Sequence, residues 1–197
     1  MIGSAKGGNL FGRLLRPDPT AATARRLYEA VVAQARQPAF FAGLEVPDTI
    51  DGRYEMVALH AHLLLRRLKD GGGGTADLAQ ALFDVMFADM DASLREMGAG
   101  DLGVGRRVKQ MATGFYGRVA AYDAGLAAGG DVLAQALRRN LFGTVTPSAA
   151  AVAAMADYAT RTAALLAGQP LERLAGGMVA FGPAPAGRAP AVPRENH

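Results

Sequence analysis

Residues 82–111 read LFDVMFADMDASLREMGAGDLGVGRRVKQM, and the spacing of their apolar side chains indicates the fold class. Large apolar residues recur every three or four positions, at Phe83, Phe87, Met90, Leu94 and Met97. That period matches one face of an α-helix, which completes a turn in about 3.6 residues. Gly98 suits the position just after a helix C-terminus. We therefore predict a half-buried helix that ends in a glycine turn.

The glycines of this turn also match a nucleotide-binding pattern. Gly98, Gly100 and Gly103 have the G-x-G-x-x-G spacing with which dinucleotide-binding proteins hold a pyrophosphate. That motif needs a strand before it and a helix N-terminus after it, whereas the residues before Gly98 have helical periodicity. We interpret the glycines as a helix stop and an interhelical turn, and we keep a nucleotide site as the less favoured alternative.

Helical periods flank this segment on both sides. We predict helices over about 19–37, 51–69, 75–97, 103–126, 131–143 and 147–167, with a further turn at 170–174. The expected fold is an all-α, single-domain helical bundle of about six helices. We divide the chain into a flexible N-terminal segment (1–17), a helical domain (18–177) and a disordered, proline- and alanine-rich tail (178–197), whose removal should leave stability unchanged.

The composition narrows the classes of function. A chain of 197 residues that is 50% hydrophobic and 20% charged suits one buried core. The absence of cysteine excludes disulfides, thiolate zinc sites and cysteine nucleophiles. The N-terminus, MIGSAKGGNLFGRLLRPD, lacks the apolar run of a signal peptide, and no stretch reaches the roughly 20 apolar residues of a membrane span. We expect neither export nor a transmembrane helix.

The acidic residues of the 75–97 helix raise the question of a carboxylate metal site. Asp84 and Asp91 share one stripe of that helix and Asp89 and Glu96 another, but partners within a stripe stand about 10.5 Å apart along the axis. Neither pair can hold one ion alone. Asp91 and Arg95 instead have the spacing of an i, i+4 ion pair, so we interpret this surface as a solvated charged face.

The histidines and the known catalytic motifs give no support for an enzyme. His60 and His62 are two residues apart on a predicted helix, so they point about 200° away from each other and cannot share a metal ion. His60 lies beside Val57 and Leu64, which indicates a partly buried, hydrogen-bonded side chain. The sequence contains neither a nucleophile elbow nor a Walker loop. We predict no catalytic residue, no metal site and no cofactor.

Charge is distributed unevenly around the glycine turn. Residues 77–101 contain six acids and one arginine, whereas residues 102–118 contain four cations and no acid. Either the two helices pair these charges with each other or with water, or the charges form a surface for a binding partner. On the second interpretation, the partner-binding residues are Asp89, Asp91, Arg107, Lys109, Tyr116 and Arg118.

Three segments resemble the ubiquinol-cytochrome c chaperones, which assist the assembly of cytochrome b into respiratory complex III. They are DGRYEMVALHAHLLLRRL at 51–68, the segment 82–111, and FYGR at 115–118. The specific part is D-M-D-x-S-L-R-E-M-G at 89–98, and the resemblance covers about residues 10–145. It implies an all-helical, non-enzymatic chaperone domain that binds nascent cytochrome b, with the ribosome as a further partner. We expect no DNA partner.

The resemblance also bears on location. A chaperone of this family would act beside the inner membrane, as a peripheral protein without a membrane span. Because no mitochondrial presequence is visible at the N-terminus, the chain resembles the bacterial branch, which implies a cytoplasmic protein. Two other functions stay open: an RNA- or ribosome-binding helical module that uses Arg106, Arg107 and Lys109, and a carboxylate metalloenzyme.

Overall fold

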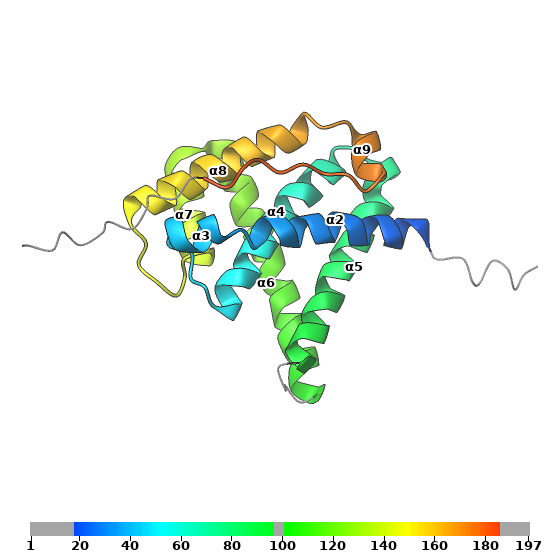
Figure 1. The fold of residues 1–197 in the computed structure, drawn as a ribbon, viewed down its shortest axis with the longest axis horizontal. Helices are drawn as coiled ribbons and strands as arrows, with labels where there is room; N and C mark the ends of the chain where they lie inside the picture. The colour runs from blue at the N-terminus through cyan, green and yellow to red at the C-terminus, as the bar shows by residue number, and fades with distance from the viewer. Residues whose placement is uncertain (1–17, 97–100, 186–197) are drawn as a thin grey trace, which may run out of the picture.

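A computed structural model describes residues 18–96 and 101–185, and it confirms the predicted all-α class (Figure 1). The described part contains six long helices and two short ones: α2 (Pro19–Ala35), α3 (Pro38–Gly43), α4 (Ile50–Lys69), α5 (Gly73–Glu96), α6 (Asp101–Ala128), α7 (Gly130–Asn140), α8 (Ala149–Ala167) and α9 (Leu171–Ala175). The predicted stop at Gly98, with Gly100 and the segments 1–17 and 186–197, lies outside the described residues.

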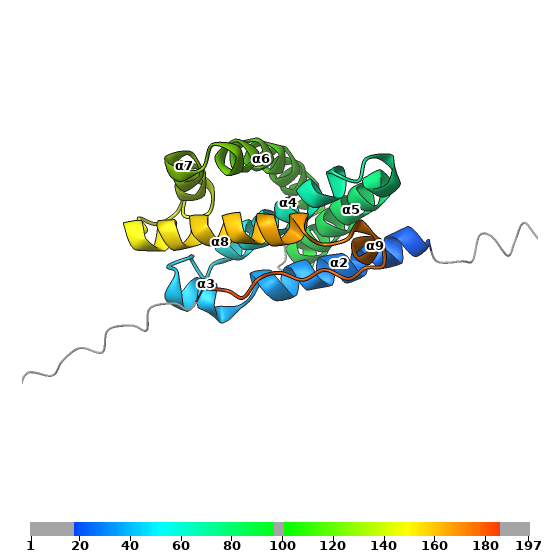
Figure 2. The same ribbon diagram turned by 90° about the horizontal axis from the view of Figure 1, so that it is seen from above.

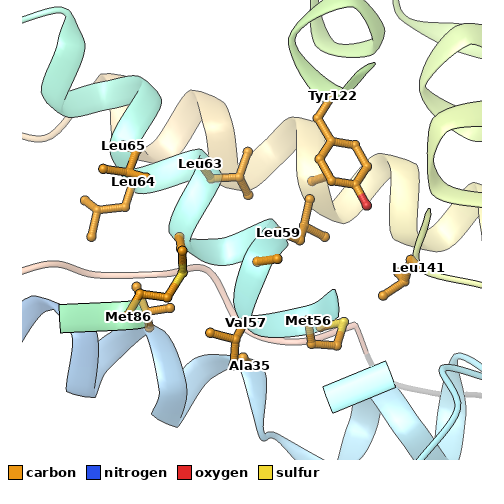
Figure 3. Close-up of a cluster of buried hydrophobic side chains, with 14 of the residues drawn as sticks. Ala35, Met56, Val57, Leu59, Leu63, Leu64, Leu65, Met86, Tyr122 and Leu141 are labelled. Atoms are coloured by element: carbon orange, nitrogen blue, oxygen red, sulfur yellow. The ribbon is translucent and has the colours of Figure 1, made fainter. Parts of the chain in front are cut away.

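Helix α4 is the centre of the molecule, because other helices surround it. Every residue of α4 from Glu55 to Leu65 is buried, although the spacing of apolar residues in this helix predicts only one apolar face. Figure 3 shows its side chains directed toward Tyr122 on α6, Met86 on α5 and Ala35 on α2. A helix buried on all sides places its polar residues in the core as well, where they need partners.

The other helices pack around α4 and against one another. Helix α2 packs along α5 and α4, and α8 packs against α4 and α7. Helices α5 and α6 lie side by side as a hairpin that extends away from the rest of the bundle (Figure 1). Seen from above, α6 and α7 flank one side of α8 while α2 lies on its other side (Figure 2).

Capping side chains fix several helix ends. Asp18 accepts a hydrogen bond from the Thr20 amide at 2.9 Å and so caps the start of α2. We expected Thr75 or Asp77 to cap the third long helix, which is wrong, since α5 begins at Gly73 and contains both residues. The Thr75 hydroxyl instead donates to the Leu68 carbonyl at the end of α4, which ties the two helices together.

The segment between α2 and α4 contains a helix that the sequence analysis missed. Pro38 directly follows the helix predicted over about 19–37, and it occupies the first turn of α3. A proline suits that position because the first-turn amide needs no intrahelical acceptor. The short helix places Phe40 in the core with no exposed surface.

The predicted disordered tail is wrong for residues 178–185, which form an extended strap between α2 and α8 (Figures 1 and 2). The Gln169 side chain exchanges two hydrogen bonds with the backbone of Ala180, at 2.7 and 2.9 Å. Gln34 donates to the Gly182 carbonyl at 2.8 Å, and the Phe181 ring packs edge-on against His60. The proline content of this segment did not predict these contacts, because side chains outside the strap, on α2, α4 and the turn after α8, hold it rather than its own local structure.

His60 is fully buried and hydrogen-bonded, more deeply than the expected partly buried side chain. Its Nδ1 lies 2.8 Å from the Met56 carbonyl, which only accepts, so Nδ1 carries the proton. Its Nε2 then accepts from the Tyr158 hydroxyl at 2.7 Å, and that hydroxyl accepts from Gln34 at 2.8 Å. One network therefore joins α4, α8, α2 and the strap.

The strap gives the first testable prediction. Replacing Phe181 by alanine should lower the free energy of unfolding by about 1–2 kcal/mol, because it removes a half-buried ring from the core beside His60. Met178→Ala is the matched control, since that strap side chain is 55% exposed. Urea denaturation measures both variants. Equal stability of the two would show that the strap contributes nothing to the core.

The buried histidine gives a second prediction. Burial lowers the pKa of His60 from 6.5 to about 4, so the unfolded chain binds a proton where the folded chain does not. The stabilisation is therefore complete above pH 6.5 and is lost as the pH falls toward 4. We expect the free energy of unfolding to be about 2 kcal/mol lower at about pH 5 than at about pH 7.5 for this residue alone.

Urea denaturation at the two pH values measures this dependence. Burial lowers the pKa of His62 in the same direction, to about 4, so it adds to the slope. His60→Gln keeps a polar side chain and removes one titrating group, and it should flatten the pH dependence relative to the unaltered protein. An identical slope in the variant would contradict a neutral, buried His60.

Candidate functional site

The candidate site is a groove at the N-terminal end of α4. Two adjoining hollows of about 520 and 180 Å³ form it, and both are lined by Ile50, Tyr54, Leu94 and Met111. The larger hollow continues between α6 and the segment that follows α7, and the smaller one continues between α2 and α5. We call the two together the α4 groove.

A tight loop fixes the rim of the α4 groove. The Thr49 hydroxyl accepts from the Gly52 amide at 3.1 Å and caps α4. A Cβ at position 52 would lie 2.0 Å from the Pro47 carbonyl oxygen, so only glycine allows this close approach. The loop holds Ile50 in the first turn of α4, where its side chain is 60% exposed.

A half-buried ion pair forms the inner wall of the groove. Arg118 on α6 donates through two nitrogens to the carboxylate of Glu55 on α4, one of them at 2.6 Å. Burial raises the pKa of Glu55, and the guanidinium opposes that rise. The guanidinium also lies over the Tyr54 ring, 5.5 Å from its centre. Arg118 was predicted to contact a partner, but its donors are used to join α4 to α6.

Two other predicted residues lie on the groove and have partners there. Asp89 accepts from the Tyr28 hydroxyl at 2.8 Å, which joins α5 to α2. Burial and this carboxylate together raise the pKa of Tyr28. Arg107 extends from α6 toward α4, with Nη2 3.7 Å from Asp51 Oδ1 and more than half of its side chain exposed. Both residues remain accessible to a partner at the rim.

The remaining three predicted residues lie elsewhere. Asp91 pairs with Arg95 at 2.6 Å along α5, as the i, i+4 spacing predicts. Lys109 is exposed and lines neither hollow of the groove. Tyr116 is 63% exposed and packs on Phe83, beside a different cavity. The structure therefore does not gather the six candidates into one surface.

The opposite charges of α5 and α6 were expected to pair with each other or with water, or to bind a partner. Several of them instead have partners on other helices: Asp89 bonds α2, and the cations Arg107 and Arg118 face acids of α4. Charge signs along the chain cannot reveal such pairings, because the partners are about sixty residues away in sequence.

Sequence reasoning missed the apolar floor of the groove. Met90 and Leu94 were assigned correctly to an apolar helix face, yet they line the groove as well as the core, and Met111 on α6 lines it with them. Ile50 was not singled out at all. The signal that could have identified it is a large aliphatic residue directly after the capping Thr49, at a helix start where polar residues are common.

The described residues can also be searched for a metal site and for a membrane-spanning helix. Among the described residues, no group of three histidine or acidic side chains could hold one metal ion. No helix in the ranges 18–96 and 101–185 combines the length and the apolar character that a membrane crossing requires.

The chain is similar to known proteins over most of its length. The family model described as Ubiquinol-cytochrome C chaperone matches residues 42–181, which includes part of the strap. The crystal structure of the Cbp3 homolog from Brucella abortus superposes with a TM-score of 0.77 at 39% sequence identity, and the match covers 91% of this chain and 98% of that one.

Curated relatives from animals are more distant. Ubiquinol-cytochrome-c reductase complex assembly factor 1 of Xenopus laevis is 27% identical over 118 residues, which is 60% of this chain and 59% of that protein. The Drosophila melanogaster protein of the same name is 26% identical over 156 residues, covering 77% of this chain and 60% of the relative. This chain thus spans about three fifths of either relative. With more than half of its residues matched by the family model, the chain belongs to the ubiquinol-cytochrome C chaperone family.

Proposed function

We propose that this protein is a non-enzymatic assembly chaperone for ubiquinol-cytochrome c reductase and that its client is newly made cytochrome b. Membership of the chaperone family supports the chaperone role, and the names of the animal relatives support the complex that is assembled. Because cytochrome b is a membrane protein, the chaperone would work as a peripheral protein at the inner membrane, on its cytoplasmic side.

The α4 groove is the proposed client site, and the exposed apolar side chain at its rim is the observation that carries this assignment. Ile50 keeps 60% of its surface in water next to an apolar floor that contains Leu94 and Met111. An apolar rim over an apolar hollow favours a partner that covers it. Flexible methionine side chains at positions 90 and 111 suit a site that adapts to different apolar residues of a client.

Charge around the groove indicates which client segments fit. Apart from the internal pair of Glu55 and Arg118, the lining contains four arginines (36, 53, 107 and 139) and two aspartates (51 and 89). A segment with apolar residues flanked by acidic ones would complement this rim. The groove would therefore hold an amphipathic stretch at the end of a membrane span rather than the apolar middle of one.

Replacing Ile50 by aspartate tests this assignment. Position 50 is in the first turn of α4, where an acid is compatible with the helix dipole, so the fold should be unaffected. A bound client would bury the new carboxylate without a partner, so capture of cytochrome b from membranes that are making it should fall by about fivefold or more.

Val132→Asp is the matched control. Val132 is also β-branched, 44% exposed and in the first turn of a helix, α7, but it does not line the groove. The control should capture cytochrome b normally, and both variants should keep the circular dichroism spectrum and melting temperature of the unaltered protein. Normal capture by the Ile50 variant would disprove the groove assignment, whereas no capture by the unaltered protein would disprove the client.

A further inference from the structure

A second cavity, of about 290 Å³, lies between α4, α5 and α6 and shares no lining residue with the α4 groove. Each helix contributes side chains at intervals of three or four residues, so one face of each helix is directed toward the same space. The lining stretch on each of α4 and α5 extends over eight residues, a rise of about 10 Å along the helix. Such a cavity has the dimensions of a small ligand, not of a partner helix.

One end of this cavity is aromatic. The centre of the Phe83 ring on α5 lies 5.9 Å from the centre of the Phe115 ring and 5.7 Å from that of the Tyr116 ring, both on α6. Tyr116 forms the exposed rim of the cavity. Ala79 and Val119 continue this apolar wall. Because Ala79 is small, space remains in front of it that a bound hydrocarbon would fill.

The other end of the cavity is polar and incompletely paired. His62 is 2% exposed, and its buried Nε2 has no hydrogen-bond partner among the described residues. That nitrogen lies 3.5 Å from Asp123 Oδ1, and Arg66 Nη1 lies 3.6 Å from the same oxygen. Lys69 adds a second cation, for which the described part of the chain provides no ion-pair partner.

The charges at this end leave an excess of one positive charge. Burial lowers the pKa of His62 to about 4, so its imidazole is neutral near pH 7 and offers hydrogen bonding rather than charge. Asp123 can balance only one of the two cations, Arg66 and Lys69. A ligand with a single negative charge and acceptor oxygens would balance the other cation and would also reach the unpartnered His62.

We propose that the cavity binds a single-chain amphiphile with a carboxylate head, namely a free fatty acid of medium length. The head group contacts Arg66, Lys69 and His62, and the hydrocarbon chain lies along Ala79 and Val119 toward the aromatic end. Burial of the chain against these apolar side chains provides affinity, and the cations provide selectivity for an anionic head. This site is independent of the client groove.

Titration of the purified full chain with decanoate tests the proposal. We expect saturable one-to-one binding in calorimetry and a rise in melting temperature with ligand concentration. The imidazole signals of His62 in NMR spectra should shift with decanoate and not with decyltrimethylammonium, which has the same chain and a cationic head. Saturable binding of both amphiphiles with equal affinity would overturn the proposal, because the protein would then select only for hydrocarbon.

Variants locate the site. Arg66→Gln combined with Lys69→Gln should weaken decanoate binding at least about tenfold, whereas Arg138→Gln, an exposed arginine on α7, should leave it unchanged. Ala79→Leu should abolish binding by filling the space beside Val119. Unchanged affinity in the double variant, or tighter binding of decyl phosphate than of decanoate, would overturn the carboxylate assignment.

Discussion

The arrangement of the other helices depends on the burial of α4 on all sides. A helix with that environment needs a partner for each polar side chain that it brings into the core, because an unpaired buried polar group costs several kcal/mol. Glu55 is bound by Arg118 of α6. His60 accepts from Tyr158 of α8, whose hydroxyl accepts in turn from Gln34 of α2. The exception is His62, whose buried Nε2 has no partner among the described residues. The need to pair the buried polar side chains of α4 therefore determines which helices pack against it and at which turn.

The two buried polar groups of α4, Glu55 and His60, hold different helices against it. The network from His60 through Tyr158 to Gln34 fixes α8 and α2 against the middle of α4, and Gln34 extends it to the strap. The Glu55–Arg118 pair fixes α6 one turn nearer the N-terminus of α4. Because α6 is held there, its first turns extend past the start of α4 with α5 beside them, and the α4 groove lies in the resulting angle.

Periodicity was sufficient to predict the six long helices, because each presents apolar side chains to the core at helical spacing. Periodicity could not predict that α4 is surrounded by other helices. Apolar residues spaced three or four positions apart identify one buried face of a helix and give no information about the environment of its other faces. The strap shows the same limit, because its contacts come from side chains outside it, Gln34 on the distant α2 and Gln169 in the turn after α8. Charge patterns identified Asp89 and Arg107 near the groove, but they could not distinguish Arg118, which forms part of the core scaffold, from a free cation.

A chaperone must expose apolar surface without losing its own fold, and the contacts around α4 explain how this chain does both. Ile50 contributes little to folding, because Thr49 and Gly52 fix the start of α4 through the backbone rather than through apolar packing. The core that stabilises the protein begins one turn later, at Glu55. In the proposed function, a client would cover the exposed side chain of Ile50 at the rim, while Leu94 and Met111 beneath it remain packed in the bundle that supports the groove.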